Sequence, residues 1–492
     1  MIALLLILIP LLSGIGAFFL KNGNNARSWA LFSSLLTLTV SILGLTVLNH
    51  PGNLAFKVEW MPELGSSFSI RLDGMGQLLC LLTAISFPLI FITTWNHAYK
   101  NAHNFFALML LSQAGLLGVF LAMDALVFYF FWELALIPVY FLCSIWGGGK
   151  RVAATFKFFI YTFIGSLLML VGIIYLQSLT PDKSFDISAF YNLQISPKTQ
   201  NWVFLFMFIA FAIKMPVFPF HSWQPDTYEQ SPTAVTMVLS GVMVKMGVFA
   251  VIRWLLPIFP DSSYGYGETT IAMWTVVGMI YASLLAMRQD DMKRLIAYSS
   301  IAHIGLMVIA IFSESEIGMQ GVMIQMFNHG INIIGLWIIV EIIEQKYGTR
   351  KLSELGGLAQ KAPAMAILFV IVALANIALP LTNAFVGEFM MFTGIFTSSI
   401  FRYEFIIVPA AGLCIILGAV YTLKMIQKVL YGNTNALTET GTDIRFHEKL
   451  ALIVIVVLIL VAGIYPQPFL DLTRDTTNQI LNEANITSFL KK

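Results

Sequence analysis

Apolar runs of about twenty residues recur along the whole chain and are separated by short polar segments. A helix needs roughly 20 predominantly apolar residues to cross a bilayer. The hydropathy pattern therefore predicts about fourteen membrane-spanning helices, over residues 1–20, 28–49, 75–95, 104–123, 125–146, 153–178, 200–220, 233–255, 269–287, 293–313, 318–343, 363–398, 405–431 and 449–469. The longest segments between them are too short to form a catalytic domain: 50–74, 179–199, 344–362 and 432–448.

Two of the predicted spans contain a break. In the seventh, "KMPVFPFHSW" places Pro216 and Pro219 beside Lys214, and each proline removes a helix hydrogen bond. In the twelfth, "ANIALPLTNAFVGEF" places Pro380 next to a polar pair in the middle of the run. Broken spans at corresponding positions of two halves predict an internal repeat with a transport site. The layout alone indicates this repeat, because no strong sequence identity links the two halves.

This layout predicts an all-α polytopic membrane protein with four parts. Residues 1–103 would form helices 1–3, and residues 432–492 would form helix 14 and a C-terminal tail. Between them, residues 104–256 would form a first repeat from helices 4–8, and residues 257–431 a second repeat from helices 9–13.

The composition agrees with a membrane protein and excludes several other classes. Hydrophobic residues make up 58% of the chain and charged residues only 11%, whereas a soluble domain carries about 25% charged residues. The mean hydropathy is +0.81. The net charge of +2 comes without a dense basic patch, so nucleic acid is not an expected partner. Cysteines 80, 143 and 414 lie far apart in apolar runs, which predicts neither a disulfide framework nor a metal site.

The distribution of lysine and arginine predicts the orientation of the bundle. The loops after odd-numbered spans hold most of these residues, and cytoplasmic loops collect such charges: Lys21, Arg27, Lys100, Lys150, Arg151, Arg288, Lys293, Arg294, Lys346, Arg350, Lys351, Lys361, Lys428, Arg445 and Lys449. We therefore expect the odd-numbered loops to face the cytoplasm and both termini to lie on the other side.

Four ionisable residues fall well inside predicted spans: Glu133, Lys214, Lys245 and Glu388. A lysine or aspartate at the centre of a membrane helix costs about 2.5–3.5 kcal/mol on insertion scales, so such residues are usually paired, hydrated or functional. One interpretation is that they fasten helices together in structural pairs. Their spread over separate helices favours proton movement, because a lysine near a glutamate is a proton site whose affinity changes with burial and with the partner's position.

Two histidines extend this set. In span eleven, "GVMIQMFNHGINIIGLW" places Gln325, His329 and Asn332 on one helix face, and span ten carries His303 in "IAYSSIAHIG". These side chains could form a proton relay, or they could hold helices together by hydrogen bonds as polar residues often do in membranes. Asp124, near the start of span five, is a further candidate that could equally be an interfacial charge.

Five segments together resemble the antiporter-like subunits of respiratory complex I: "FFWELALIPVYFL", "KMPVFPFHSWQPDTYEQSPTAVTMVLSGVMVKMG", "RLIAYSSIAHIGLM", "MIQMFNHGINIIGLW" and "LTNAFVGEFMMF". The resemblance covers nearly the whole chain and is strongest in spans four to thirteen. It implies fourteen helices, two inverted five-helix repeats and broken helices 7 and 12. One departure is Tyr228, which stands where many members of the family have a histidine.

The resemblance also implies a role for each candidate residue. Glu133 would pair with Lys214 and modulate it, and Lys245 would relay protons toward the centre of the membrane. His303 and His329 would continue the path from there.

Glu388 would be the terminal site, exchanging protons with the opposite face. Its surroundings, "FVGEF", are typical of one antiporter-like subunit, whereas related subunits usually carry lysine at this position. Asp124 matches a family carboxylate and is a tentative member of the path.

The implied activity is proton transport across the bacterial cytoplasmic membrane by one subunit of a proton-translocating NADH–quinone oxidoreductase. The chain shows no cysteine set for iron–sulfur clusters, no phosphate-binding loop and no dinucleotide fingerprint. No cofactor is therefore expected here, and FMN and iron–sulfur clusters are expected in partner subunits. The implied partners are neighbouring antiporter-like subunits, other membrane subunits of the complex and lipids. The alternatives are a subunit of a multisubunit Na⁺/H⁺ antiporter and a membrane scaffold without an ion path.

Overall fold

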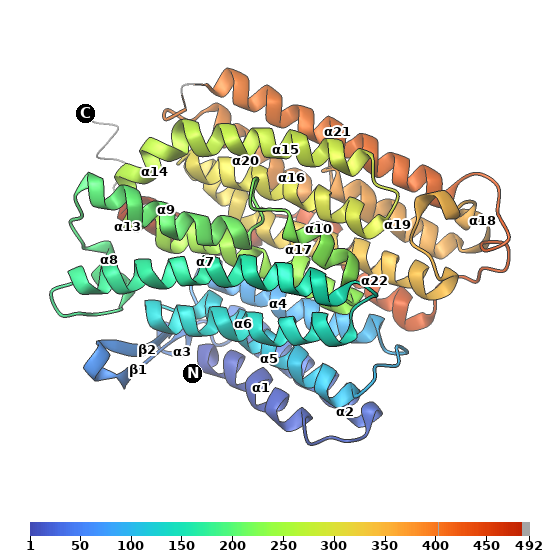
Figure 1. Ribbon diagram of the computed structural model, residues 1–492, viewed down its shortest axis with the longest axis horizontal. Coiled ribbons are helices and arrows are strands. Elements are labelled where there is room, and N and C mark those ends of the chain that lie inside the picture. The colour runs from blue at the N-terminus through green and yellow to red at the C-terminus, as the bar shows by residue number, and fades with distance from the viewer. Residues whose placement is uncertain (402, 485–492) are drawn as a thin grey trace.

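Long helices lie side by side across the whole molecule in the computed structural model, which describes residues 1–401 and 403–484 (Figure 1). Within these residues, ten helices are long and apolar enough to cross a membrane, and four shorter helices are also apolar. Every predicted span coincides with one helix or with a series of consecutive helical segments. The all-α membrane class is therefore confirmed, while the number of crossings stays a prediction.

The N-terminal part contains three long helices and the only strands in the described residues. Its elements are α1 (Ile2–Ala17), α2 (Gly23–Leu45), α3 (Pro51–Leu54), β1 (Ala55–Met61), η1 (Pro62–Leu64), β2 (Ser66–Arg71) and α4 (Gly74–Thr93). The two strands form an antiparallel hairpin in which Ala55 pairs with Arg71.

The middle of the chain forms the next group of helices. Its elements are α5 (Ala102–Leu121), α6 (Ala125–Trp146), α7 (Arg151–Leu179), α8 (Ile187–Tyr191), α9 (Pro197–Lys214), α10 (Trp223–Gln230), α11 (Thr233–Val238), η2 (Leu239–Met243), α12 (Lys245–Ala250), η3 (Val251–Leu255) and α13 (Leu256–Ile258).

The remaining residues form the last group of helices. Its elements are α14 (Pro260–Tyr266), η4 (Gly267–Ile271), α15 (Ala272–Met287), α16 (Met292–Phe312), α17 (Glu316–Tyr347), η5 (Leu352–Glu354), α18 (Leu358–Lys361), α19 (Pro363–Asn376), α20 (Asn383–Phe396), α21 (Glu404–Leu430), α22 (Phe446–Ile464) and α23 (Gln467–Glu483).

Both predicted breaks are present. Helix α9 ends at Lys214, and the chain runs without regular helix to Ser222 before α10 begins. In the second break, α19 ends at Asn376 and α20 begins at Asn383. Ala378 and Leu381 have positive φ values of 55° and 75° there, a region that residues with a Cβ atom rarely occupy. These breaks interrupt the regular helix ladder inside two of the predicted spans.

Span eight contains a feature that the sequence did not predict. Two π-helical turns, η2 and η3, interrupt the helix from Thr233 to Ile258. Single π-turns inside an α-helix are rare and often mark functional sites, because the wider turn redirects side chains and frees a carbonyl. The first of them, η2, lies immediately before Lys245.

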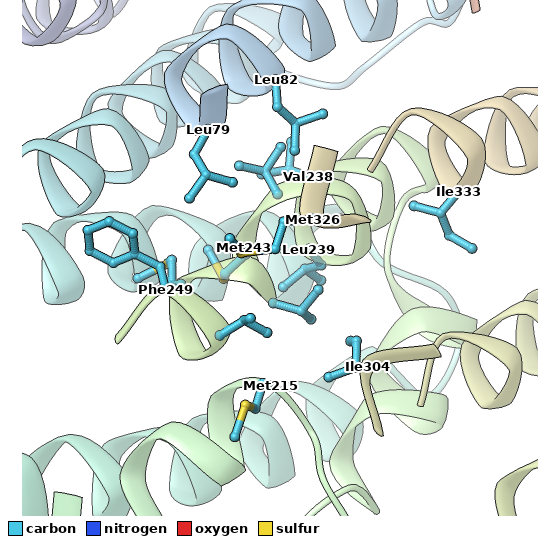
Figure 2. Close-up of a cluster of buried hydrophobic side chains, with 14 of the residues drawn as sticks. Leu79, Leu82, Met215, Val238, Leu239, Met243, Phe249, Ile304, Met326 and Ile333 are labelled. Atoms are coloured by element: carbon cyan, nitrogen blue, oxygen red, sulfur yellow. The ribbon is translucent and has the colours of Figure 1, made fainter. Parts of the chain in front are cut away.

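The centre of the bundle is apolar. The apolar middle of α17 and the segments from α11 to α13 are buried, whereas only 33–39% of the residues in the apolar stretches of α2, α7, α21 and α22 are buried, as in lipid-facing helices. Figure 2 shows a cluster of buried hydrophobic side chains from η2 and the elements near it, including Leu79, Leu82, Met215, Val238, Leu239, Met243, Phe249, Ile304, Met326 and Ile333. Any ionisable group in this region is therefore surrounded by hydrocarbon.

The two ends of the bundle carry different structures. The hairpin, α8 and α14 lie at one end, and α18 lies at the other (Figure 1). The amino group of Met1 donates a hydrogen bond to Asn53 O, and Gly74 N donates one to Thr476 Oγ1 in α23. The N-terminus and the last described helix therefore lie at the same end of the bundle.

Candidate functional site

Lys245 and His329 meet in the centre of the bundle. The Nζ atom of Lys245 lies 2.8 Å from Nδ1 of His329 and also donates a hydrogen bond of 2.7 Å to the carbonyl of Ser240. Their exposed fractions are 0% and 2%. A lysine amine and an imidazole in direct contact, both buried, form a site where one proton can move between two bases.

The local chain geometry explains this contact. In the π-turn η2, Val244 N bonds to the carbonyl of Leu239, five residues back, rather than to that of Ser240. The carbonyl of Ser240 accepts from Lys245 Nζ and fixes the amine beside α17. Helix α17 comes this close because Gly330 faces Gly241: a Cβ atom on Gly330 would lie 2.9 Å from the carbonyl oxygen of Gly241.

His303 and Glu388 form a second contact beside α17. The Nδ1 atom of His303 lies 3.1 Å from Oε1 of Glu388, which also accepts a hydrogen bond of 3.4 Å from Gln325. The ring of His303 lies 5.7 Å from the ring of His329, centroid to centroid. Neither histidine Nε2 atom has a hydrogen-bond partner among the described residues.

These contacts form one row across four helices, here called the central row: Lys245 on α12, His329 on α17, His303 on α16 and Glu388 on α20. A cavity of about 20 Å³ touches His303 and Glu388. A cavity needs roughly 10–15 Å³ to hold a water molecule, so one water fits at this end of the row.

The amide side chains of span eleven have a structural role. Asn328 donates 2.7 Å to the carbonyl of Asn383, and Asn332 donates 3.3 Å to the carbonyl of Ala375. Both carbonyls flank the break between α19 and α20, where the regular helix ladder is interrupted. These amides therefore hold helices together. Hydrogen bonding between helices was one of the two interpretations of the polar side chains in span eleven.

Lys214 lies apart from the central row. It is 2% exposed, and its Nζ atom lies 5.4 Å from the ring centroid of Trp132 on α6. Glu133, the next residue, is half-buried and near enough for a Coulombic interaction with Lys214. However, the Nζ atom of Lys214 and the Oε1 atom of Glu133 are both buried and have no hydrogen-bond partner in the described part of the chain. The structure thus brings the two residues near each other without the direct contact that the sequence suggested.

Asp124 is an anchor outside the central row. Its fully buried carboxylate caps the N-terminus of α6 by accepting from Leu126 N at 3.0 Å and Val127 N at 3.1 Å. It also accepts from Ser66 Oγ and Ser67 N, each at 3.0 Å, and so ties the hairpin to α6. A carboxylate with four such donors is fully engaged in holding the backbone.

Sequence reasoning missed further buried charges, among them Arg253 and Glu341. Arg253 forms an ion pair with Asp73, the residue that caps α4. Glu341, near the C-terminal end of α17, is 5% exposed and faces His97. A charge near the end of a predicted span is ordinarily interpreted as interfacial, so the sequence did not predict that Arg253 and Glu341 are buried. Among the described residues, no group of three or more His, Cys, Asp or Glu side chains could hold a metal ion.

The fold and the central row define a class: a multi-pass helical membrane protein with acid–base side chains in direct contact at the centre of its bundle. Residues 122–414 match the family model described as "NADH:quinone oxidoreductase/Mrp antiporter, TM". The chain belongs to this family of antiporter-like membrane subunits.

Individual relatives agree with this assignment. NADH-quinone oxidoreductase subunit M of Pseudomonas aeruginosa is 35% identical over 95% of this chain and 95% of its own length. F(420)H(2) dehydrogenase subunit M of Methanosarcina mazei is 34% identical over 98% of each chain. A chain in the structure of respiratory complex I from Thermus thermophilus with bound NADH superposes with a TM-score of 0.90, at 26% identity, over 98% of this chain and 100% of that chain. The resemblance to complex I subunits is confirmed, and the chain is part of a multisubunit membrane complex.

Proposed function

We propose that the chain is the M-type, proton-translocating subunit of an NADH:quinone oxidoreductase, and that the central row carries the proton. The observation that supports this most directly is the contact of 2.8 Å between Lys245 and His329, followed by His303 and Glu388, in an apolar core. Partner subunits would supply the energy from redox chemistry with FMN and iron–sulfur clusters. This subunit would contribute the path for H⁺.

Proton transfer along the central row follows from the chemistry of its members. Protonated Lys245 donates its proton to Nδ1 of His329 and becomes a neutral amine. His329 passes a proton from its ring toward His303, and one water or a ring rotation bridges the 5.7 Å between the two centroids. His303 then donates from Nδ1 to the carboxylate of Glu388 at 3.1 Å. A buried charge is costly, so each step is favourable only when the next group is free to take the proton.

Lys214 and Glu133 would control how Lys245 is loaded. Lys214 has no hydrogen-bond partner among the described residues and sits on Trp132, so its charge depends on the nearby carboxylate of Glu133. A movement of Glu133 toward or away from Lys214 would raise or lower the proton affinity of the amine, because an opposite charge nearby favours the protonated form.

The two halves of the chain are proposed to be inverted repeats, residues 104–256 and 257–431, flanked by 1–103 and 432–492. The similarity of two helix starts supports this. Asp124 caps α6 and lies in an antiparallel bridge with Asp186, while Asp291 caps α16 and lies in an antiparallel bridge with Lys351. The first of these caps belongs to the hairpin end of the bundle, and the second to the opposite end (Figure 1).

The charge distribution supports an orientation with α18 and the other odd-numbered loops in the cytoplasm and both termini outside, in a bacterial cytoplasmic membrane. The proton would then move from the cytoplasm to the outside. Neighbouring antiporter-like subunits and lipids would cover the exposed apolar helices.

The second candidate function is that of a subunit in a multisubunit Na⁺/H⁺ antiporter, since the family includes Mrp antiporters. Relatives named subunit M of quinone oxidoreductases match nearly the full chain, and Glu388 in "FVGEF" is typical of that subunit, so the first candidate is preferred. The relative named for F(420)H(2) is about as similar to this chain as the relative named for NADH. NADH is the proposed electron donor because more of the relatives are named for it.

Replacing Lys245 tests the proposed path. Lys245→Met keeps the length of the side chain and removes the ionisable amine. In an assembled complex reconstituted into vesicles, we expect NADH-driven proton pumping to be lost, with assembly verified on a native gel. Pumping at the rate of the unaltered complex would rule out the central row as the path.

A further inference from the structure

A cavity of about 620 Å³ opens at the odd-loop end of the bundle. Three carboxylates and three cationic side chains line it: Glu229, Glu341, Glu344, Lys100, Lys293 and Arg350. Among the three carboxylates, Glu341 is by far the most buried, with a side chain that is 6% exposed against 33% for Glu344 and 26% for Glu229. Glu341 is therefore the most buried acid of a wide, polar cavity that has room for many water molecules.

The groups around Glu341 come from four parts of the chain. Gln345 on the same helix donates 2.6 Å to its Oε1 atom, and His97, from the loop before α5, places Nδ1 3.5 Å away. Lys293 on α16 lies close enough for a Coulombic interaction, and the hydroxyl of Thr233 on α11 lies nearby. The side chain of His97 is 41% exposed, so this imidazole connects the buried acid with the solvent.

A line of buried hydroxyl groups leads inward from Thr233. Thr233, Thr236 and Ser240 lie along one side of α11 and η2, and all three are buried. Ser240 Oγ donates 2.9 Å to the carbonyl of Thr236, and the carbonyl of Ser240 in turn accepts from Lys245 Nζ. Twelve residues separate Thr233 from Lys245, a rise of roughly 18 Å along a helix. This is about half the thickness of the hydrocarbon core, roughly 30 Å.

We infer that Glu341 is the proton-collecting acid that supplies Lys245, with His97 as its exchange partner at the surface. The carboxylate takes a proton from water in the cavity, and the remaining hydroxide is neutralised by buffer in the bulk solution. The neutral carboxyl group releases that proton past Thr233 along the hydroxyl-lined side of α11, where it binds the unprotonated amine of Lys245. Glu341 is then again an anion facing Lys293 and His97. This inference rests on the proposed function of the central row.

The pH dependence of pumping tests the inference. Glu341→Gln keeps the size and the hydrogen bonds of the side chain but cannot collect a proton. In reconstituted complexes, we expect pumping equal to that of the unaltered complex at mildly acidic pH, where protons are plentiful, and several-fold slower pumping at alkaline pH. Lys245→Met should be inactive at every pH, since it removes a group of the path itself.

Two further variants keep the result interpretable. Glu344→Gln changes a carboxylate of the same cavity that pairs with Lys293 and Arg350, and its pH profile should match the unaltered complex. Thr233→Val removes the hydroxyl without changing any charge and should reproduce the alkaline loss even if Glu341→Gln fails to assemble.

The possible outcomes separate this inference from the proposed function. Unchanged pH profiles of Glu341→Gln and Thr233→Val, together with an inactive Lys245→Met, would overturn the uptake role and leave the central row intact. An equal alkaline loss in Glu344→Gln would also overturn it, because the charge of the cavity and not Glu341 would then be responsible. Normal pumping by Lys245→Met would contradict the proposed function itself.

Discussion

The Nζ atom of Lys245 lies 2.8 Å from Nδ1 of His329, and both side chains are sealed inside an apolar core. Two positive charges at this distance repel each other strongly where water does not screen them. The pair therefore holds one extra proton rather than two, and the proton's position depends on what the neighbouring groups carry. His303 and Glu388 repeat this arrangement with an acid in place of the amine.

Lys214 is predicted to be essential although it touches no carboxylate directly. In an assembled complex, Lys214→Ala should lower NADH-driven proton pumping at least about tenfold, since removing a group that transfers protons typically costs a factor of 10²–10⁴. Glu133→Ala should have a similar effect, and Glu133→Asp a milder one, because the charge is kept. Proton uptake into vesicles, corrected for complex content, measures this.

Lys424 provides the control for that experiment. It lies on α21 with an exposed side chain, outside the central row. Lys424→Ala should pump normally. If Lys214→Ala also pumps normally in a complex that assembles, Lys214 has no part in loading Lys245.

Asp124 is predicted to matter for stability and not for transport. Asp124→Asn keeps the side-chain oxygen but loses the charge that strengthens four hydrogen bonds to α6 and the hairpin. Hydrogen bonds to charged groups contribute about 1.5–3 kcal/mol each, and the amide retains part of this, so we expect a loss of roughly 1–3 kcal/mol. Thermal unfolding of the purified complex should shift to lower temperature while the proton-to-electron ratio stays unchanged. A lowered ratio in the intact complex would return Asp124 to the proton path.

The orientation can be tested by labelling. Lys150 is exposed before α7 at the odd-loop end, and Glu63 is exposed in the turn of the hairpin at the other end. In intact cells, a membrane-impermeant thiol reagent should label a cysteine at position 63 and should label one at position 150 only after the cytoplasmic side is opened. Cys80, Cys143 and Cys414 are buried and should remain unlabelled in both cases. The reverse pattern would invert the proposed direction of transport.

Local sequence patterns predicted the helices and the ionisable residues of the site. The breaks beside Lys214 and around Pro380 were predictable because proline removes a helix hydrogen bond whatever its tertiary surroundings. Glu133, Lys245 and Glu388 stood out because a charge within an apolar run is rare and costly.

Contacts between helices were not predictable in the same way. The pairing of Lys245 with His329 depends on the close approach of Gly241 and Gly330 and on the π-turn η2, neither of which has a local signal in the sequence. The contact of the Trp132 ring with the amine of Lys214 likewise joins two distant parts of the chain. The burial of Glu341 near the end of its span was not predictable either, and its neighbours His97 and Lys293 come from distant parts of the chain.

The proton-to-electron ratio of a Glu388→Gln complex in sealed vesicles tests the central claim most directly. Glutamine keeps the size of the side chain and can still bond to Gln325 and His303, but it cannot take up a proton at the end of the central row. Moving one charge against 100 mV costs about 2.3 kcal/mol, so a site that cannot change its proton affinity cannot complete the transfer. We predict normal assembly with a clearly lowered ratio, and partial recovery in Glu388→Lys. A ratio and a turnover equal to those of the unaltered complex would contradict the account.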